Sequence, residues 1–214
     1  MKKKADVVIV GTGVAGLFSA LNLPDDKEII MITKSDAESS DSFLAQGGIC
    51  VLRDEQDYDS YFEDTMRAGH YENRKESVDI MIRSSGKIIE DLVGYGVEFE
   101  KDGEAFAYTR EGAHSRPRIL FHADVTGKEI TSKLLARVRE KNNVTIYEYT
   151  TMTDILEENG KCAGITVKTQ SGEESSIYAD YTILASGGIG GLYQHSTNFP
   201  HLTGDALEVA KKHH

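Results

Sequence analysis

Residues 6–20 read D-V-V-I-V-G-T-G-V-A-G-L-F-S-A, and this stretch decides the fold. A β-branched run at residues 7–10 precedes glycines spaced G-x-G-x-x-G, and apolar positions at helical spacing follow, which predicts strand, tight turn and helix. Gly11 permits the turn, Gly13 has no Cβ to obstruct a pyrophosphate, and Gly16 allows close helix–strand packing. The free N–H groups and dipole of the helix attract phosphate. The stretch predicts a dinucleotide site, with a purely structural glycine turn as the alternative.

Length and charge limit the classes of protein that remain. A chain of 214 residues buries one sizeable core. Its 24 basic and 35 acidic residues give a formal net charge of -11, which opposes binding to nucleic acid or to an anionic membrane. No run reaches the roughly 18 apolar residues of a membrane span, and Lys2–Lys4 lead directly into the first strand instead of a signal-peptide core. We expect a cytoplasmic protein with a small-molecule ligand.

The two cysteines, Cys50 and Cys162, are far apart and have no metal-ligand spacing. We therefore expect free, buried thiols in a reducing compartment, and no metal site.

The second strand is predicted at residues 28–33, parallel to the first because a helix intervenes. Dinucleotide folds often place an acid after this strand to hold the ribose hydroxyls, but here the strand ends in Thr33-Lys34. A lysine there would also suit a 2′-phosphate. On this stretch alone, NADP and FAD both remain open.

Residues 43–49 read F-L-A-Q-G-G-I, in which a glycine pair follows one amide side chain. This composition suits backbone wrapped closely around a flat ligand, and an ordinary loop before an edge strand explains it equally well. Amphipathic helices are predicted at 57–68 and 77–92, followed by at most a short strand at 97–99. The expected core face of the second helix consists of Ile80, Met81, Ile88, Ile89 and Leu92.

Residues 109–122 concentrate basic side chains in an acidic protein, around the single acid Glu111. The basic members are Arg110, His114, Arg116, Arg118 and His122. Arginines can bind carboxylates through two hydrogen bonds, histidines can move protons near neutral pH, and the lone carboxylate could hold an ammonium group. The segment predicts an anionic ligand, and a solvated loop with scattered ion pairs remains the alternative.

The remaining elements complete an α/β pattern. A helix capped by Asp124 or Thr126 runs to about residue 140, a strand follows at 144–149, and 152–178 reads as a small antiparallel β-meander without a site. A buried parallel strand at 179–185 ends in Ser186-Gly187-Gly188, where the backbone could approach a ligand, and a helix begins at 204. We predict a Rossmann-like fold with a central parallel sheet and the meander as an insertion.

Five segments together carry a family resemblance: D-V-V-I-V-G-T-G-V-A-G-L, S-F-L-A-Q-G-G-I, T-R-E-G-A-H-S-R-P-R-I-L, L-A-S-G-G and T-N-F-P-H-L-T-G-D-A. The chain resembles the L-aspartate oxidase branch of the fumarate reductase and succinate dehydrogenase flavoprotein family over essentially all 214 residues. The segment R-E-G-x-H-S favours this branch most. The resemblance implies that residues 1–214 are the N-terminal portion of an FAD-binding domain, incomplete at its C-terminus, with a capping domain and a C-terminal helical domain outside the chain.

FAD is the implied cofactor, and NADP becomes remote because this family commonly has a Ser/Thr-Lys pair at Thr33-Lys34. The glycine turn, with Gly11 and Gly16, would place Thr12, Gly13, Val14 and Ala15 on the pyrophosphate, and Lys34 would lie near the adenosine end. The implied isoalloxazine contacts are Ser42, Phe43, Leu44, Ala45, Gln46, Gly47 and Gly48. Thr151 and Met152 would lie near the adenine, and Asp205 would contact the flavin nucleotide. Ala206 replaces a glycine that is usual after that aspartate. Covalent relatives have a histidine where this chain has Asp41, so we predict noncovalent FAD.

The implied reaction is oxidation of L-aspartate to iminoaspartate, with oxygen or fumarate as acceptor, as the first step of NAD biosynthesis and with a functional link to quinolinate synthase. Glu111 would orient the substrate amino group, and His114, Arg116 and His122 would shape the pocket. The principal substrate-binding arginine and histidines are expected beyond residue 214, so the chain alone should not turn over aspartate. The alternatives are a soluble fumarate reductase or succinate dehydrogenase flavoprotein and a noncatalytic FAD- or ADP-binding module.

Overall fold

The computed structural model describes residues 3–213, so Lys2 of the basic start and His214 lie outside the described residues. The chain divides into two units, which are treated separately below. The sheet unit comprises Met1–Leu44 and Leu134–His214, and the helical unit comprises Ala45–Lys133.

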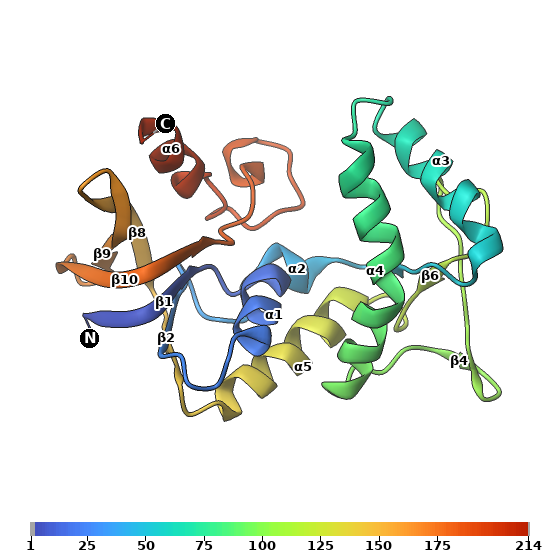
Figure 1. Cartoon of the computed structure of the whole chain (residues 1–214), viewed down its shortest axis with the longest axis horizontal. Coiled ribbons are helices and arrows are strands. Elements are labelled where there is room, and N and C mark those ends of the chain that lie inside the picture. Colours follow the sequence, from blue (N-terminus) through green and yellow to red (C-terminus); the bar gives the residue numbers. More distant parts are fainter. Residues whose placement is uncertain (1–2, 214) are drawn as a thin grey trace. The chain divides into compact units, whose positions relative to one another are not determined.

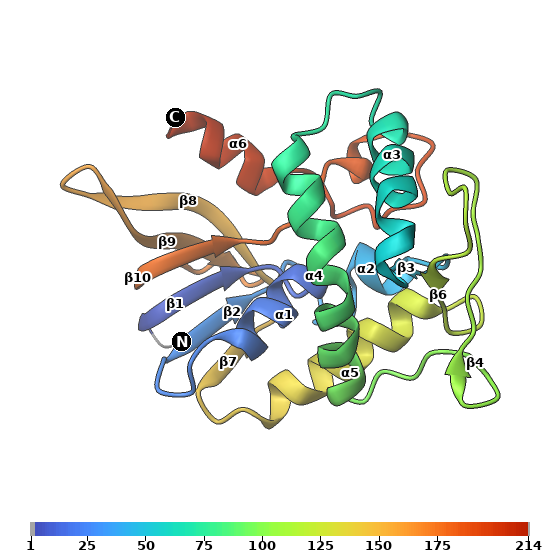
Figure 2. The same ribbon diagram turned by 45° about the vertical axis from the view of Figure 1, so that its right-hand side comes forward.

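The sheet unit is built on six strands in the order β7-β2-β1-β10-β9-β8 (Figure 1; β7 is labelled in Figure 2). Their bounds are β1 Lys4–Val10, β2 Ile29–Ile32, β7 Val144–Tyr147, β8 Thr150–Glu158, β9 Lys161–Thr169 and β10 Glu174–Leu184. β7, β2, β1 and the second half of β10 run parallel, with Val7 opposite Ile29 on one side and Tyr181 on the other. β10, β9 and β8 are antiparallel. The predicted parallel order around the first strand is confirmed.

β10 corrects the predicted boundary between meander and sheet. Its residues 174–178 pair antiparallel with β9, and its residues 178–184 pair parallel with β1, so one continuous strand replaces the two that were expected. Neither glycine nor proline occurs between Glu173 and Ala185, so no backbone breaker interrupts the strand. The second half was also expected to be buried, but the side chain of Tyr181 is 70% exposed.

Helices flank both faces of this sheet (Figure 2). The helices of the unit are α1 Val14–Asn22, α2 Asp41–Leu44 and α6 Asp205–Lys212, with a short 3-10 turn at Gly190–Leu192. α6 buries Ala206 and Val209 in the core formed with Val8, Val10 and other residues of the same face. α1 approaches the opposite face, where the side chain of Ile9 lies next to Gly16. Successive side chains of β1 therefore point alternately to α6 on one face of the sheet and to α1 on the other.

The helical unit contains two substantial helices, α3 Tyr58–Ala68 and α4 Lys75–Gly94, preceded by the 3-10 turn η1 Glu55–Asp57. Short ladders join β3 Ile49–Cys50 to β6 Ile119–Leu120, and β4 Lys101–Asp102 to β5 Ala105–Phe106. α5 Thr126–Glu140 begins in this unit and ends in the sheet unit. Residues 97–99 form no strand, although the sequence allowed a short one there.

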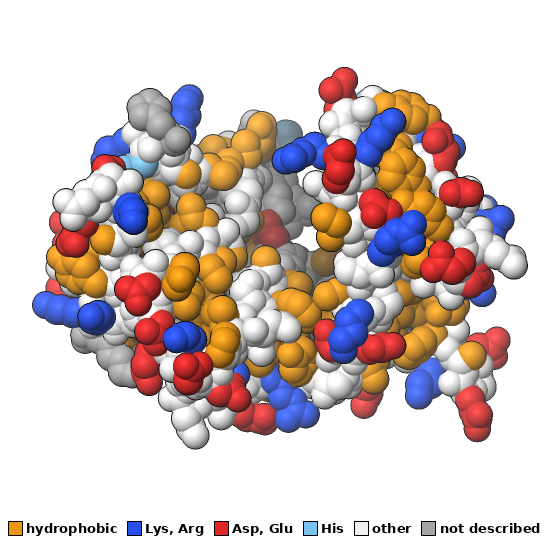
Figure 3. Space-filling view, in the orientation of Figure 1, with side chains coloured by type: hydrophobic (Ala, Val, Ile, Leu, Met, Phe, Trp, Pro, Cys, Tyr) orange, Lys and Arg blue, Asp and Glu red, His pale blue; other side chains and the backbone are white. Residues whose placement is uncertain are grey.

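α4 buries a narrower stripe than predicted. Its inward positions are spaced by four and three residues, and they are Val78, Ile82, Ser85, Ile89 and Leu92. Ile80 and Met81 lie off this stripe and are 67% and 45% exposed, so their assignment to the core was wrong. Figure 3 shows hydrophobic side chains between the charged ones over α4.

Among residues 3–213, no helix combines the length and the apolar character that crossing a membrane requires.

Candidate functional site

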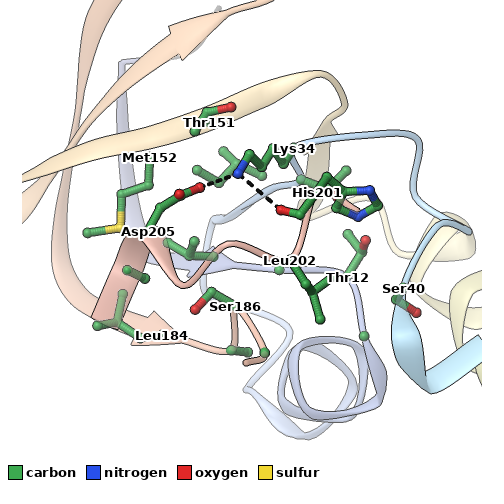
Figure 4. A pocket seen from close by; sticks show the side chains of 18 of the residues that line it. Thr12, Lys34, Ser40, Thr151, Met152, Leu184, Ser186, His201, Leu202 and Asp205 are labelled. Carbon is green, nitrogen blue, oxygen red and sulfur yellow. Dashed lines mark hydrogen bonds and ion pairs between the residues drawn. The ribbon is translucent and has the colours of Figure 1, made fainter. Parts of the chain in front are cut away.

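A cavity of ≈ 360 Å³ lies in the sheet unit at the carboxyl ends of three parallel strands (Figure 4). β1, β2 and β10 each contribute their last residue, namely Val10, Ile32 and Leu184. The glycine turn and segments 39–42, 150–152, 185–187 and 201–207 complete most of the wall. Open α/β sheets bind ligands at this position, and the volume lies within the usual range for small-molecule sites.

Glycine is needed at the three positions of the turn for different steric reasons. Gly11 has φ +115, and a Cβ there would lie 2.3 Å from the carbonyl oxygen of Ala185. A Cβ on Gly16 would lie 2.1 Å from the carbonyl oxygen of Gly11. Both glycines are therefore required by backbone packing. A Cβ on Gly13 would instead lie 3.1 Å from the Ser42 hydroxyl oxygen, a side chain that can rotate, so Gly13 keeps the cavity floor open.

Lys34 fastens the end of β2 to the start of α6 (Figure 4). Its Nζ donates to Asp205 Oδ2 at 2.5 Å, to Thr203 Oγ1 at 2.6 Å and to the carbonyl oxygen of His201 at 3.0 Å. Burial alone would raise the pKa of Asp205, but the hydrogen bonds from Lys34 and Thr203 outweigh it and lower that pKa. Lys34 and Asp205, both implied as ligand contacts by the family resemblance, thus meet in one wall and largely neutralise each other.

Hydroxyl groups supply donors at the opposite end of the cavity, beside the start of α1. Ser42 Oγ accepts the Val14 N–H at 3.1 Å, and Thr12 is 2% exposed. Ser40 is 9% exposed, and its Oγ has no hydrogen-bond partner within residues 3–213. Because buried hydroxyls are almost always hydrogen-bonded, an unpartnered one in a cavity wall indicates a ligand oxygen as its partner.

The sequence predicted that the backbone at Ser186-Gly187-Gly188 could approach a ligand, but it identified no cavity residue between 189 and 204. His201 Nε2 lies 3.0 Å from the Ser39 carbonyl oxygen, and Asp41 accepts the Phe199 N–H at 2.9 Å and a bond from the Asn198 amide. These contacts hold the segment against residues 39–41, and Ser186, Gly187, His201, Leu202 and Thr203 line the cavity. The motif T-N-F-P-H-L-T-G-D-A could have indicated these residues, but only Asp205 was predicted from it as a ligand contact.

The structure gathers many of the predicted cofactor residues in this cavity and leaves others outside its wall. Those that line it are Gly11, Thr12, Gly13, Ala15, Lys34, Ser42, Thr151, Met152 and Asp205. Val14 and Gly16 lie in the first turn of α1, and Phe43 and Leu44 end α2. Ala45, Gln46, Gly47 and Gly48 belong to the helical unit. The meander was interpreted as having no site, which is wrong, because the start of β8 lines the cavity.

In the helical unit, the basic segment forms a loop closed by backbone hydrogen bonds between Thr109 and Ile119. Arg118 is 0% exposed and binds Asp57 with two hydrogen bonds of 2.9 Å. Its remaining donors reach Asp64 at 2.7 Å, Ser60 at 2.9 Å and His114 Nδ1 at 3.2 Å. All five guanidinium N–H groups are therefore used. Arg118 holds the loop and is not free to bind an anionic ligand, contrary to the prediction.

Two buried carboxylates compensate this charge. Burial alone would raise the pKa of Asp64, but bonds from Ser115 and Arg118 outweigh it and hold that pKa well below its ordinary value. The pKa of Asp57 is also lowered, because bonds from Arg118 and Ser60 overcome the opposing effect of burial. The hydrogen bonds that Arg118 donates to Asp57, followed by the one it donates to Asp64, raise the pKa of Arg118 against the effect of its burial. The group stays ionised as a unit.

His114 has a defined tautomer within this arrangement. Arg118 can only donate, so His114 Nδ1 accepts and the ring proton of the neutral form lies on Nε2, which is 3.3 Å from Cys50 Sγ. Burial raises the pKa of the Cys50 thiol. Both cysteines are free, as predicted, but Cys50 is half-buried and Cys162 is exposed, so the expectation of buried thiols was wrong for Cys162.

Glu111 lies against the glycine pair of the A-Q-G-G segment. A Cβ on Gly47 would lie 2.6 Å from Glu111 Oε1 and 3.1 Å from Oε2. Two other predicted residues are engaged elsewhere: His122 Nδ1 lies 2.8 Å from the Glu98 carbonyl oxygen, and the exposed Arg116 is 3.9 Å from Asp57. The structure thus joins Glu111 to the A-Q-G-G segment and gives Arg116 and His122 other neighbours.

Across residues 3–213, no three histidine, cysteine or acidic side chains are grouped so that they could hold a metal ion.

A glycine turn at the carboxyl ends of parallel strands, with an unpartnered hydroxyl beside a helix N-terminus, defines a dinucleotide-binding protein. The chain belongs to the FAD binding domain family, whose model matches residues 6–213. The predicted fold class and FAD as cofactor are confirmed, and the orphaned Ser40 hydroxyl and the space over Gly13 fit such a group.

Curated relatives include the L-aspartate oxidase of Clostridium perfringens, 46% identical over 210 residues, which cover 98% of this chain and 48% of the relative. The L-aspartate oxidase of Clostridium acetobutylicum is 41% identical over 214 residues, covering 100% and 49%. The resemblance to L-aspartate oxidases is confirmed, and the chain spans about half the length of these relatives.

Among solved structures, a variant of the Escherichia coli quinol fumarate reductase subunit FrdA matches with a TM-score of 0.94 and 25% identity, covering 100% of this chain and 38% of that chain. Sdh1 of Mycobacterium smegmatis matches with a TM-score of 0.89 and 25% identity, covering 99% and 38%.

Proposed function

We propose that this chain is the FAD-binding part of an enzyme that oxidises L-aspartate to iminoaspartate, with oxygen or fumarate as electron acceptor. The similarity to L-aspartate oxidases supports this activity. The observation that carries it is the position of Glu111, an exposed carboxylate within a basic loop, against the backbone of Gly47. A carboxylate there suits the ammonium group that distinguishes aspartate from fumarate and succinate.

The cavity of the sheet unit would hold FAD, which supplies the acceptor for the hydride removed from the substrate. Thr12, Ser40 and the N–H groups at the start of α1 other than that of Val14, which donates to Ser42, would donate to its phosphate oxygens, and the space over Gly13 would admit them. Lys34 is already paired with Asp205, so these contacts are made mainly by neutral donors. Thr151 and Met152 would contribute the wall expected near the adenine.

In the substrate site, Glu111 would orient the ammonium group by a charge-assisted hydrogen bond. His114 is held by Arg118 with its proton on Nε2, so it would act as a donor that shapes the site. The buried Arg118 group would keep both residues in place. Contacts to the substrate carboxylates are expected from a longer polypeptide, since the chain is about half the length of its curated relatives.

We propose that FAD is bound noncovalently, because Asp41 occupies the position of the histidine in covalent relatives and its carboxylate already accepts bonds from Phe199 and Asn198. Acid precipitation of the holoprotein should leave the yellow flavin in the supernatant. Flavin that stays with the pellet would contradict this assignment.

The activity is tested with a polypeptide of the length of the curated relatives that contains this chain, loaded with FAD under anaerobic conditions. L-aspartate should bleach the visible absorbance of the flavin, and admission of oxygen should restore it with formation of hydrogen peroxide. Succinate is the matched control, because it lacks only the amino group. Bleaching by succinate and not by aspartate would instead support a fumarate reductase or succinate dehydrogenase, the second candidate, which the structural similarity to FrdA favours.

The wider setting follows from this proposal. Iminoaspartate would pass to a quinolinate-forming reaction and so to NAD, which implies a functional link to quinolinate synthase. The acidic composition and two free cysteines support a cytoplasmic location.

A further inference from the structure

We propose that Gly47 is a positioning residue for Glu111: the missing side chain of Gly47 creates the place that the Glu111 carboxylate occupies, and this sets the preference for an amino-bearing substrate. The inference rests on the proposed function of Glu111 in holding the substrate ammonium group. It assigns to one glycine of the A-Q-G-G segment a role toward the substrate loop, in addition to any contact it makes with the flavin.

The contact between the two residues is closer than any side chain would allow. A Cβ on Gly47 would lie 2.6 Å from Oε1, 3.1 Å from Oε2 and 3.2 Å from Cδ of Glu111. The nearest atoms around this position are thus all from the Glu111 carboxyl group. A methyl group on residue 47 and the present carboxylate position exclude each other.

The backbone at Gly47 cannot withdraw to relieve that clash. The next residue, Gly48, is packed so tightly that a Cβ there would lie 2.4 Å from Ile119 Cγ2 and from the Leu120 carbonyl oxygen. β3 pairs with β6 directly after it, and the Gly127 N–H donates to the Ala45 carbonyl oxygen at 2.8 Å on the other side. Gly47 therefore lies between two fixed points.

The loop that carries Glu111 is held equally firmly at its ends. Backbone bonds between Thr109 and Ile119 close its base. Ser115 donates both its N–H and its hydroxyl to Asp64 at 2.7 Å, and the buried Arg118 binds the same carboxylate. What can move is the Glu111 side chain, which is exposed and flexible. An alanine at position 47 would therefore displace the carboxylate and leave the fold intact.

Displacing this carboxylate should affect substrates unequally. Aspartate presents an ammonium group whose charge-assisted hydrogen bond depends on the carboxylate position. Fumarate has no such group. A variant that only disturbed the flavin would slow both reactions, because both use the same cofactor.

The test is a double-mutant cycle on the FAD-loaded polypeptide of relatives' length, with Gly47→Ala, Glu111→Gln and the double variant. Aspartate-driven flavin reduction and fumarate-driven reoxidation are measured separately, with FAD affinity as a third readout. We expect Gly47→Ala to lower the ratio of kcat/KM for aspartate to the fumarate rate by about tenfold or more, because any effect through the flavin contact of Gly47 reaches both reactions. In the Glu111→Gln background it should have almost no further effect on this ratio.

A compensating swap separates positioning from general damage. Glu111→Asp in the Gly47→Ala background withdraws the carboxylate by one methylene and should recover part of the aspartate activity. Gly112→Ala is the matched control, because it neighbours Glu111 but nothing lies within 4 Å of its added Cβ. Parallel losses for aspartate and fumarate in Gly47→Ala, or additive effects in the cycle, would overturn the inference. Normal aspartate activity in Glu111→Gln itself would instead overturn the proposed function of Glu111, and this inference with it.

Discussion

The sheet unit and the helical unit use charge in opposite ways. In the sheet unit, Lys34 and Asp205 form an ion pair whose side chains are 32% and 39% exposed, and the cavity beside it is lined mainly by apolar residues, glycines and neutral hydroxyls. In the helical unit, Arg118 and its partners Asp57 and Asp64 are 0% to 3% exposed. The Lys34–Asp205 pair leaves room for a ligand beside it, whereas all the N–H groups of Arg118 are bonded within the protein and none can bind a ligand.

This difference reflects what each region must hold. The glycine turn is fixed by parallel strands and by packing of Gly11 and Gly16, so its cavity needs no buried charge. The loop from 109 to 119 exposes most of its side chains and has little apolar surface to bury, so its order depends on Arg118. A buried ion pair is a poor source of net stability but a severe constraint on geometry once formed.

Removal of Arg118 should have the largest effect. Arg118→Ala leaves two buried carboxylates without their cation and should lower the free energy of unfolding by about 3–5 kcal/mol. Arg116→Ala is the control, because Arg116 is exposed and 3.9 Å from Asp57, and it should change stability by less than about 1 kcal/mol. Denaturant unfolding measures both, and equal losses would mean that burial of Arg118 is unimportant.

The glycine turn should be the next most sensitive feature. Gly11→Ala combines an unfavourable positive φ, worth about 1–3 kcal/mol, with a clash against the Ala185 carbonyl, and should abolish FAD binding. Gly13→Ala meets only the Ser42 hydroxyl and should retain the fold while weakening FAD binding. Thermal unfolding of the apoprotein and FAD titration separate the two effects. A well-folded Gly11→Ala protein that binds FAD normally would contradict the packing argument.

Acid should weaken the helical unit through its lowered carboxyl pKa values. Because Asp64 has a lower pKa folded than unfolded, its contribution is present above the ordinary pKa of about 4 and is lost as the pH falls below it. Each such group contributes a slope of at most about 1.4 kcal/mol per pH unit. Asp64→Asn should be less stable than the wild type at neutral pH, and the difference should shrink between about pH 4 and pH 2. A difference that does not depend on pH would exclude Asp64 as a source of the acid sensitivity.

Ser40→Ala should have the smallest effect and the most specific one. The apoprotein should keep or slightly gain stability, because an unpartnered buried hydroxyl is removed. FAD binding should weaken by about 0.5–1.5 kcal/mol, equivalent to roughly 2–13-fold in the dissociation constant. Ser19→Ala, a change on α1 away from the cavity wall, is the control. Unchanged FAD affinity in Ser40→Ala would show that another group satisfies this hydroxyl.

Local patterns predicted the features that depend on local physics. The strand, turn and helix at residues 6–20 follow from β-branched residues and glycine spacing, and the structure gives each glycine its steric reason. The continuity of β10 was missed because its pairing partner changes from β9 to β1 without a glycine or proline to mark the change. Local sequence contains no record of such a change.

In the candidate site, the contacts that could not be predicted from the sequence were mainly those between residues far apart in the chain. Arg118 looked like an available cation because Asp57 and Asp64 are more than fifty residues away in the chain. The contact between Gly47 and Glu111 likewise joins two motifs whose separation hid their relation. Periodicity misassigned Ile80 and Met81 because they are apolar residues next to the buried stripe of α4, and only tertiary packing shows which residues are covered.

The central claim is that the sheet unit binds the cofactor and that the loop of the helical unit selects the substrate. The most direct measurement is the ratio of aspartate to fumarate turnover, determined with the FAD dissociation constant for Ser40→Ala and Glu111→Gln in the FAD-loaded polypeptide of relatives' length. We expect a crossed result: Ser40→Ala weakens FAD binding and keeps the ratio, whereas Glu111→Gln keeps FAD binding and lowers the ratio by about tenfold or more. If both variants change both quantities in parallel, the two regions do not have separate roles.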